Sequence, residues 1–288
     1  MYNIIELDLF SDWLKIAEDE LKTEGYPTEN IDSQKIPILY FTLQKMKIMS
    51  IPRKILKSDI FMCPSEMLDA LNILEEKIIN GDDLRPYQSR LLKNIENKDG
   101  LLFDWGIHHL HLGTILQNDG FINRTGPLLY VRFYQDTAYF IDVLEHGAWT
   151  QQDLLRIIHR NFPSSIEEYK IPGIDGLERN YDDEEIKHLR NFNSNTLLEV
   201  APGEFYLGPG GGFTGSGHSG DAVNMHIDNH NGIKELEAKI KESPEEVIKQ
   251  QHSLNIITNS NLVFNLIKRN GEYILKENNN NFEIKLGN

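Results

Sequence analysis

The stretch with the clearest chemical potential in this 288-residue sequence is DWGIHHLHLG, residues 104–113, which holds three histidines within four residues. Side chains alternate between the two faces of a strand, so a strand here places His109 and His111 on one face and His108 on the other. A histidine with an ordinary pKa of about 6.5 gives and takes protons near neutral pH. We therefore predict that His109 and His111 face one substrate or one metal ion.

Two aromatic segments follow, GPLLYVRFY and TAYFIDVLEHG, and the two-residue step between them is typical of a hairpin. Alternation places Tyr130 and Arg132 on one side of the first strand, and Asp142 and His146 on one face of the second. We predict that His146 is a third catalytic or orienting group. Four residues of this region are expected to bind substrate: Arg124, Arg132, Tyr130 and Arg156.

One chemistry open to this set is cleavage of RNA by histidine acid–base catalysis. One histidine removes the proton from a ribose 2′-hydroxyl, a second protonates the leaving oxygen, and an arginine stabilises the charge on the phosphate. His109 and His111 are the predicted acid and base. This reaction needs no metal and no other cofactor.

A second chemistry uses the same histidines as zinc ligands. An H-x-H pair on one strand face projects two imidazoles to a common point, and His146 or Asp142 would complete a zinc site that keeps an open position for water. The protein would then be a zinc-dependent hydrolase with His109, His111 and His146 as ligands. H-x-H pairs occur in many unrelated metalloenzymes, so the sequence leaves both chemistries open.

Residues 100–162 resemble the C-terminal half of RelE/YafQ-type bacterial ribonuclease toxins. The shared order is a strand that carries histidines, a strand of the type LLYVRFY, a hairpin to TAYFIDVLEHG, and then a helix. The positions that match catalytic and phosphate-binding groups of that pattern are His109, His111, Arg132 and His146. The resemblance implies an RNA-cleaving toxin or phage-defence effector, with RNA as substrate and an antitoxin or inhibitor protein as partner.

The Gly-rich segment 208–220, GPGGGFTGSGHSG, offers backbone amides that can cradle a phosphate. It lacks the lysine of a P-loop, no strand–GxGxxG–helix order surrounds it, and Ser216 lacks the outer glycine spacing of a serine-hydrolase elbow. We predict a mobile surface loop. Three histidines in and after it leave a second metal or substrate cluster open: His218, His226 and His230.

The chain carries 44 acidic and 29 basic residues, a formal charge of −15. Such a surface repels nucleic acid, which excludes a general coat protein but not an enzyme with one local basic face. The same acidity fits a non-catalytic alternative, an acidic antitoxin or interaction protein whose histidines are structural.

The single cysteine, Cys63, and the lack of an apolar run of about 20 residues predict a cytoplasmic protein that makes no membrane contact.

These residues must be positioned by an α+β fold. We expect a helical N-terminal region over 1–97, a RelE-like core over 98–165 with a small antiparallel sheet and a packed helix, and a C-terminal α+β region over 166–288. Helices are predicted at 11–25, 66–81 and 183–191 from their caps and periodicity. Asn270-Gly271 is a strong hairpin signal near the C-terminus. A homo-oligomer is left open.

Overall fold

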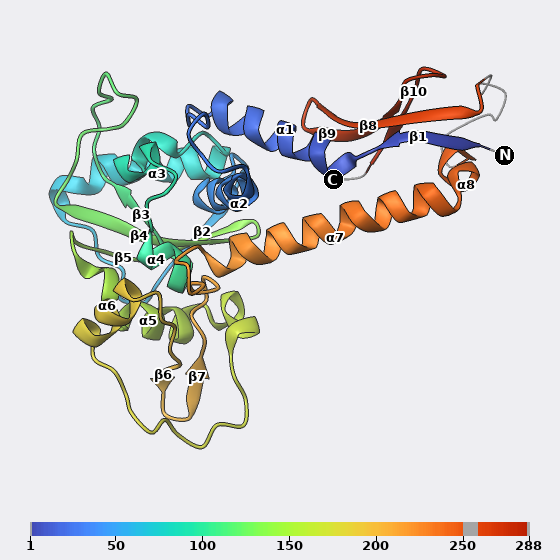
Figure 1. The fold of residues 1–288 in the computed structure, drawn as a ribbon. Helices are drawn as coiled ribbons and strands as arrows, with labels where there is room; N and C mark the ends of the chain where they lie inside the picture. The colour runs from blue at the N-terminus through green and yellow to red at the C-terminus, as the bar shows by residue number, and fades with distance from the viewer. Residues whose placement is uncertain (1, 250–258, 287–288) are drawn as a thin grey trace. The chain divides into compact units, whose positions relative to one another are not determined.

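The structure is a computed structural model that describes residues 2–249 and 259–286, with the side chain of residue 149 left out. It has an α+β fold, as predicted, in which helices alternate with small sheets (Figure 1). The chain divides into two compact units, Met1–Phe41 with Asn224–Asn288, and Thr42–Val223. Both boundaries expected from the sequence, near residues 97 and 165, lie inside the second unit. Within the described ranges, no helix combines the length and the apolar composition needed to cross a bilayer.

The first unit contains a four-stranded sheet in the order β1-β8-β9-β10. Its strands are β1 (Asn3–Leu7), β8 (Asn261–Arg269), β9 (Glu272–Glu277) and β10 (Phe282–Lys285). The Asn270-Gly271 turn joins β8 to β9 with positive φ at both residues, which confirms the predicted hairpin. The N-terminal region is mainly helical, as expected, but the sequence did not reveal β1, which pairs in parallel with β8, more than 250 residues away in the chain.

Helix α1 (Leu9–Thr23) packs on this sheet through residues at four-residue spacing, of which Trp13 and Leu21 are fully buried. Helix α8 (Pro244–Lys249) belongs to the same unit, and α2 (Ile36–Met46) and α7 (Gly220–Glu242) begin in one unit and end in the other. The ring of Trp13 stacks on Phe41 at a centroid distance of 5.6 Å. This unit therefore has its own apolar core.

The second unit is built on a sheet in the order β2-β5-β4-β3. The strands are β2 (Lys54–Lys57), β3 (His108–His111), β4 (Pro127–Tyr134) and β5 (Thr137–Glu145). Strands β3, β4 and β5 are antiparallel neighbours, which confirms the hairpin predicted between β4 and β5. The sheet is not wholly antiparallel, because β2 joins β5 in parallel.

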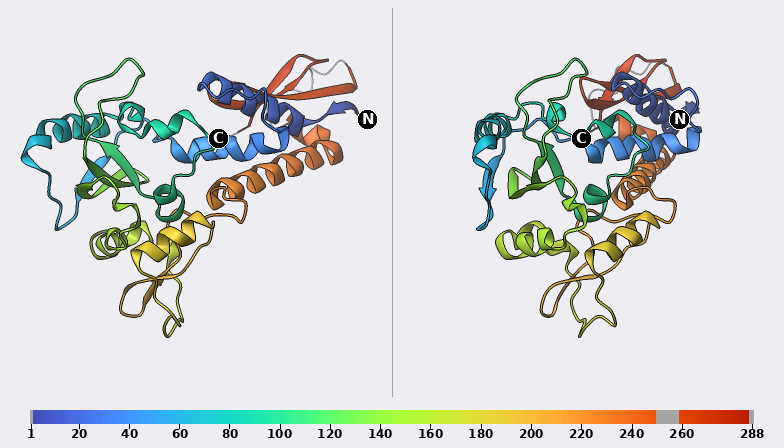
Figure 2. Two further views of the ribbon diagram at one scale, coloured as in Figure 1. Left: turned by 60° about the vertical axis from the view of Figure 1, so that its left-hand side comes forward. Right: turned by 90° about the vertical axis from the view of Figure 1, so that its left-hand side faces the viewer.

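Helices cover both faces of this sheet. Helix α3 (Leu68–Asn80) packs on the face that carries Leu110, Leu129 and Phe140. Helices α5 (Asp153–Asn161) and α6 (Asp183–Asn191) pack on the face that carries Tyr130 and Ile141. Both views of Figure 2 show the sheet between α3 and α5. Each face of the central sheet is therefore closed by an apolar core, which limits where a substrate can reach the strands.

A β-bulge in β5 changes the alternation expected there. Tyr130 of β4 pairs with Asp142 and the next residue with Phe140, so Ile141 is an extra residue. Beyond the bulge, Val143 packs with Phe140 and not with Ile141. The bulge therefore separates Asp142 from the face of Phe140, on which alternation had placed it. The Asp142 carboxylate accepts hydrogen bonds from the backbone N–H of Met62 and Val143.

The segment before β3 is a helix and not the start of a strand. Helix α4 (Gly100–Trp105) begins after Asp99, whose Oδ1 accepts a hydrogen bond from the Leu102 N–H at 2.9 Å. It ends at Gly106, which has a φ of 66° in the left-handed region. The helix and its two caps place the histidine strand immediately after a sharp change of chain direction.

The Gly-rich segment follows the two-stranded sheet of β6 (Leu198–Ala201) and β7 (Glu204–Tyr206). The prediction of a mobile surface loop is wrong, because its backbone packs on α4. The N–H of Gly210 donates to the Asp104 carbonyl oxygen at 2.7 Å, and that of Gly212 donates to the Phe103 carbonyl oxygen at 2.8 Å. A Cβ on Gly210 would collide with the carbonyl oxygen of Leu102.

We predict that Gly210→Ala lowers the free energy of unfolding by about 2 kcal/mol, because the added methyl group has no space beside α4. Gly215→Ala is the matched control, since nothing lies within 4 Å of its Cβ position, and it should change stability by less than about 0.5 kcal/mol. Urea denaturation followed by circular dichroism measures both. Equal stabilities of the two variants would contradict this packing.

Candidate functional site

A cavity of about 510 Å³ opens in the second unit where several segments meet. It lies between β3, the end of β5, the start of α4 and helix α6. The polar and aromatic side chains that matter for chemistry here are Lys98, Asp99, His109, His146, Lys187, Arg190 and Phe213. Ligand sites commonly have volumes of about 300–1,000 Å³, so this cavity is large enough for one nucleotide-sized group.

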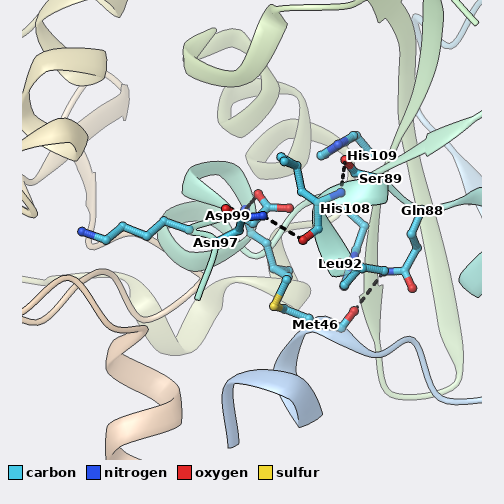
Figure 3. A pocket seen from close by; sticks show the side chains of 11 residues that line it. Met46, Gln88, Ser89, Leu92, Asn97, Asp99, His108 and His109 are labelled. Atoms are coloured by element: carbon cyan, nitrogen blue, oxygen red, sulfur yellow. Dashed lines mark hydrogen bonds between the residues drawn. The ribbon is translucent and has the colours of Figure 1, made fainter. Parts of the chain in front are cut away.

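A second, much smaller cavity adjoins the first. It has a volume of about 20 Å³, room for roughly one water molecule. Figure 3 shows this cavity with His109 beside Ser89 and with Asp99 beside Asn97. Three of these side chains, those of Ser89, Asp99 and His109, also line the larger cavity. His109 thus lines both cavities.

His109 occupies the centre of the site on β3, opposite Tyr130 in the register with β4. Burial lowers the pKa of its imidazole, the nearby Asp99 carboxylate acts in the opposite direction, and His146 lowers the pKa further. His109 is therefore neutral at pH 7 and able to accept a proton. Asp99 is held in place because it caps α4.

His146 follows β5 at the other side of the cavity, and its side chain is exposed. Its backbone N–H donates to the Gly126 carbonyl oxygen at 3.1 Å, and Gly147 after it turns the chain with a φ of 115°. Histidine is the side chain that most readily carries a proton near neutral pH. The cavity thus presents one buried and one exposed imidazole.

Three basic side chains and one carboxylate, that of Asp99, line the cavity. Lys98 donates to the Asn193 side-chain oxygen at 2.8 Å, and Lys187 lies 3.4 Å from Glu184. Arg190 is buried, donates from Nε to Asp104 at 2.8 Å and stacks its guanidinium 4.1 Å over the ring of Trp105. Asp99, Asp104 and Glu184 lie beside these three cations, so the charges at the cavity balance, whereas the whole chain is strongly acidic.

His111 does not belong to the cavity, contrary to the prediction. Its side chain is only 5% exposed, and its Nδ1 accepts a hydrogen bond from the Thr125 N–H at 3.4 Å. Burial, followed by the positive charges of its neighbours, lowers its pKa to about 4. His111 shares a strand face with His109, but the loop that ends at Thr125 covers it, so it has a structural role.

Arg132 and Tyr130 are also placed differently from the prediction. The Arg132 guanidinium is buried and donates to the carbonyl oxygens of Ser165, Trp105, Gly106 and Pro209 at 2.9–3.3 Å. Tyr130 is fully buried in the core beneath α5. Neither side chain can contact a substrate, because both are occupied inside the fold.

The two remaining predicted arginines lie on the surface. Arg124 is exposed in the loop before β4, and Arg156 is exposed on α5, where it pairs with Asp153 at 2.7 Å. Neither lines the large cavity. Of the residues predicted from sequence, the structure therefore brings together His109 and His146.

A zinc site is not assembled in residues 2–249 and 259–286. No three His, Cys, Asp or Glu side chains there converge to hold a metal ion. Of the alternative ligands predicted from the sequence, His109 and His146 line the large cavity, whereas His111 and Asp142 do not.

The sequence pattern missed Lys98, Asp99, Lys187, Arg190 and Phe213. Asp99 was detectable as a helix cap before Gly100, which fixes its position in α4 but not its proximity to His109. Lys187 and Arg190 lie on a helix that was predicted correctly, yet they are about 80 residues away from β3 in the chain.

Comparisons with protein-family models, with curated proteins and with solved structures gave no match.

We predict that Arg132→Leu destabilises the fold by about 3 kcal/mol or more, because four buried carbonyl groups lose their donor. The exposed Arg124 provides the control, and Arg124→Leu should change the free energy of unfolding by less than about 0.5 kcal/mol. Chemical denaturation of both variants measures the difference. A stable Arg132 variant would restore this residue to the list of substrate-binding candidates.

We also predict that Asp99→Asn lowers the pKa of His109 further, since the carboxylate is the group that raises it. Asparagine is an equally good helix cap, so α4 should keep its structure. NMR titration of the histidine ring protons measures the pKa, with Asp136→Asn in the exposed hairpin turn as control. An unchanged His109 titration in Asp99→Asn would show that the two groups do not interact.

Proposed function

We propose that this protein is an endoribonuclease that cleaves RNA by metal-independent histidine acid–base catalysis. The observation that carries the proposal is the placement of His109 and His146 on one cavity together with Lys98 and Lys187. Two histidines that differ in burial can hold the two protonation states that such a reaction needs. The acid–base pair is then His109 and His146, in place of His109 and His111.

The reaction follows from these positions. Neutral His109 accepts the proton of a ribose 2′-hydroxyl, and the 2′-oxygen attacks the adjacent phosphorus. The bond from phosphorus to the 5′-oxygen breaks, and the His146 imidazolium gives its proton to that oxygen. The products are a 2′,3′-cyclic phosphate and a free 5′-hydroxyl. DNA has no 2′-hydroxyl, so this chemistry selects RNA.

The basic side chains support the same reaction. Negative charge increases on the phosphate oxygens in the transition state, and cations placed before the reaction stabilise it. Lys98 and Lys187 are the amino groups at the cavity, and each is held by a neighbouring polar side chain. Arg190 is held in a buried ion pair with Asp104, which compensates its charge. Asp99 acts on His109 through its negative charge and does not itself react.

The wider role is proposed from the sequence resemblance. An RNA-cleaving chain that resembles RelE/YafQ-type toxins would act in the cytoplasm as a toxin or phage-defence effector. An antitoxin or inhibitor protein would then restrain it. The net charge of −15 belongs to the whole chain, whereas the cavity itself presents the amino groups of Lys98 and Lys187 to a phosphate.

We predict that the purified chain cleaves RNA in the presence of EDTA, and that His109→Ala and His146→Ala each lower the rate by about 10²–10⁴-fold. His188→Ala is the matched control, since this histidine is exposed on α6 and outside the cavity lining. Gel analysis of a labelled RNA measures the rates. Full activity in His109→Ala, or loss of wild-type activity in EDTA, would contradict the proposal. If the wild-type chain cleaved no RNA at all, the non-catalytic alternative would be favoured.

A further inference from the structure

Helix α7 carries a second histidine pair, within the first unit and separate from the cavity. His226 and His230 are four residues apart, so they lie one turn apart on the same helix face. Their ring centroids are 6.1 Å apart. The ring of Phe10 on α1 meets His230 edge-on at 4.5 Å and lies 6.4 Å from His226. The two imidazoles of α7 thus both contact the Phe10 ring of α1.

Both imidazoles hold a nitrogen that lacks a partner. The Nδ1 atoms of His226 and His230 are buried and make no hydrogen bond within the described residues, and the same is true of the side-chain nitrogen of Asn229 between them. A buried polar atom without a partner destabilises the folded state. Such an atom in a folded protein is commonly explained by a bound water or ion. Three of them in one helical turn indicate a common cause.

The later turns of α7 show that apolar side chains can fill the same helix face. Further along α7, this face carries Ile233 and Ile240, which are buried apolar residues at the expected spacing. Glu237 between them accepts a hydrogen bond from the Leu9 N–H at 2.7 Å. On this face, the later turns thus hold two apolar side chains and one polar side chain with a hydrogen-bond partner. The unpaired nitrogens are confined to the turn that holds the two histidines.

We propose that His226 and His230 bind a divalent transition-metal ion. Imidazole nitrogens bind Zn²⁺ at about 2.0–2.1 Å, and two rings on one ion have centroids roughly 5–6 Å apart. The observed separation of 6.1 Å therefore needs only a small ring movement. The described residues supply no third His, Cys, Asp or Glu ligand, so water completes the coordination. Imidazole ligands favour Zn²⁺, Ni²⁺, Cu²⁺ and Co²⁺ over Mg²⁺ and Ca²⁺.

A metal ion binds an imidazole through a ring nitrogen that carries no proton. Phe10 packs against both rings, so a bound ion would also restrict the contact between α1 and α7. The ion therefore acts as a structural group in the first unit, independent of the proposed RNA cleavage.

Titration of the full-length, tag-free chain with Zn²⁺ tests the site by isothermal calorimetry. We expect saturable binding of Zn²⁺ and no binding of Mg²⁺ at the same concentration. His226→Gln and His230→Gln should each weaken the affinity by about tenfold or more, which corresponds to about 1.4 kcal/mol. His188→Gln should bind as the wild type does. Zn²⁺ should also raise the melting temperature of the wild type but not of the two variants, because it binds the folded chain.

Circular dichroism and melting in EDTA separate loss of the site from loss of the fold, since both glutamine variants should then resemble the wild type. The proposal is overturned if wild-type protein binds no Zn²⁺, or if both variants bind it as tightly as the wild type does. It is also overturned if His109→Ala alone abolishes binding, because the ion would then be held by the cavity histidines. RNA cleavage is assayed in EDTA, so its outcome does not depend on this site.

Discussion

The second unit depends on one buried cation, the guanidinium of Arg132. It donates to carbonyl oxygens from the end of α4, from the Gly-rich segment and from the chain that follows α5. A planar guanidinium with five N–H donors can hold several backbone segments at once, which a lysine cannot do. Gly106 faces this group so closely that a Cβ would collide with it. The position of β3, and therefore of His109, follows from this junction.

The site is assembled from the ends of elements and not from their middles. Asp99 caps the start of α4 and lies by His109, whereas Gly106 ends the same helix and leads into β3. His146 follows the bulged strand β5, and the cations come from α6 and the segment before α4. The strand centres are covered on both faces by apolar cores, so the open positions lie at the sheet edge. This explains why neighbouring histidines of one strand have different roles.

The sequence was sufficient for local structure and for part of the site. The α+β class, helix α6 and the Asn270-Gly271 hairpin follow from caps, periodicity and turn chemistry, which act over a few residues. Alternation placed His109 and His111 on one face correctly but could not show that a loop covers His111. The burial of Arg132, the pairing of β1 with β8 and the approach of Lys187 to the cavity arise from contacts between distant segments. Such contacts leave no pattern in a single sequence.

The central claim is that the 2′-oxygen of RNA is the nucleophile and that His109 and His146 transfer the protons. Its most direct test is the mass of the fragments released from an oligodeoxynucleotide that contains a single ribonucleotide. The account predicts one cut, on the 3′ side of the ribose, which leaves a 2′,3′-cyclic phosphate and a 5′-hydroxyl. An upstream fragment whose terminal ribose carries a free 3′-hydroxyl, or cleavage of the all-deoxy strand, would contradict it.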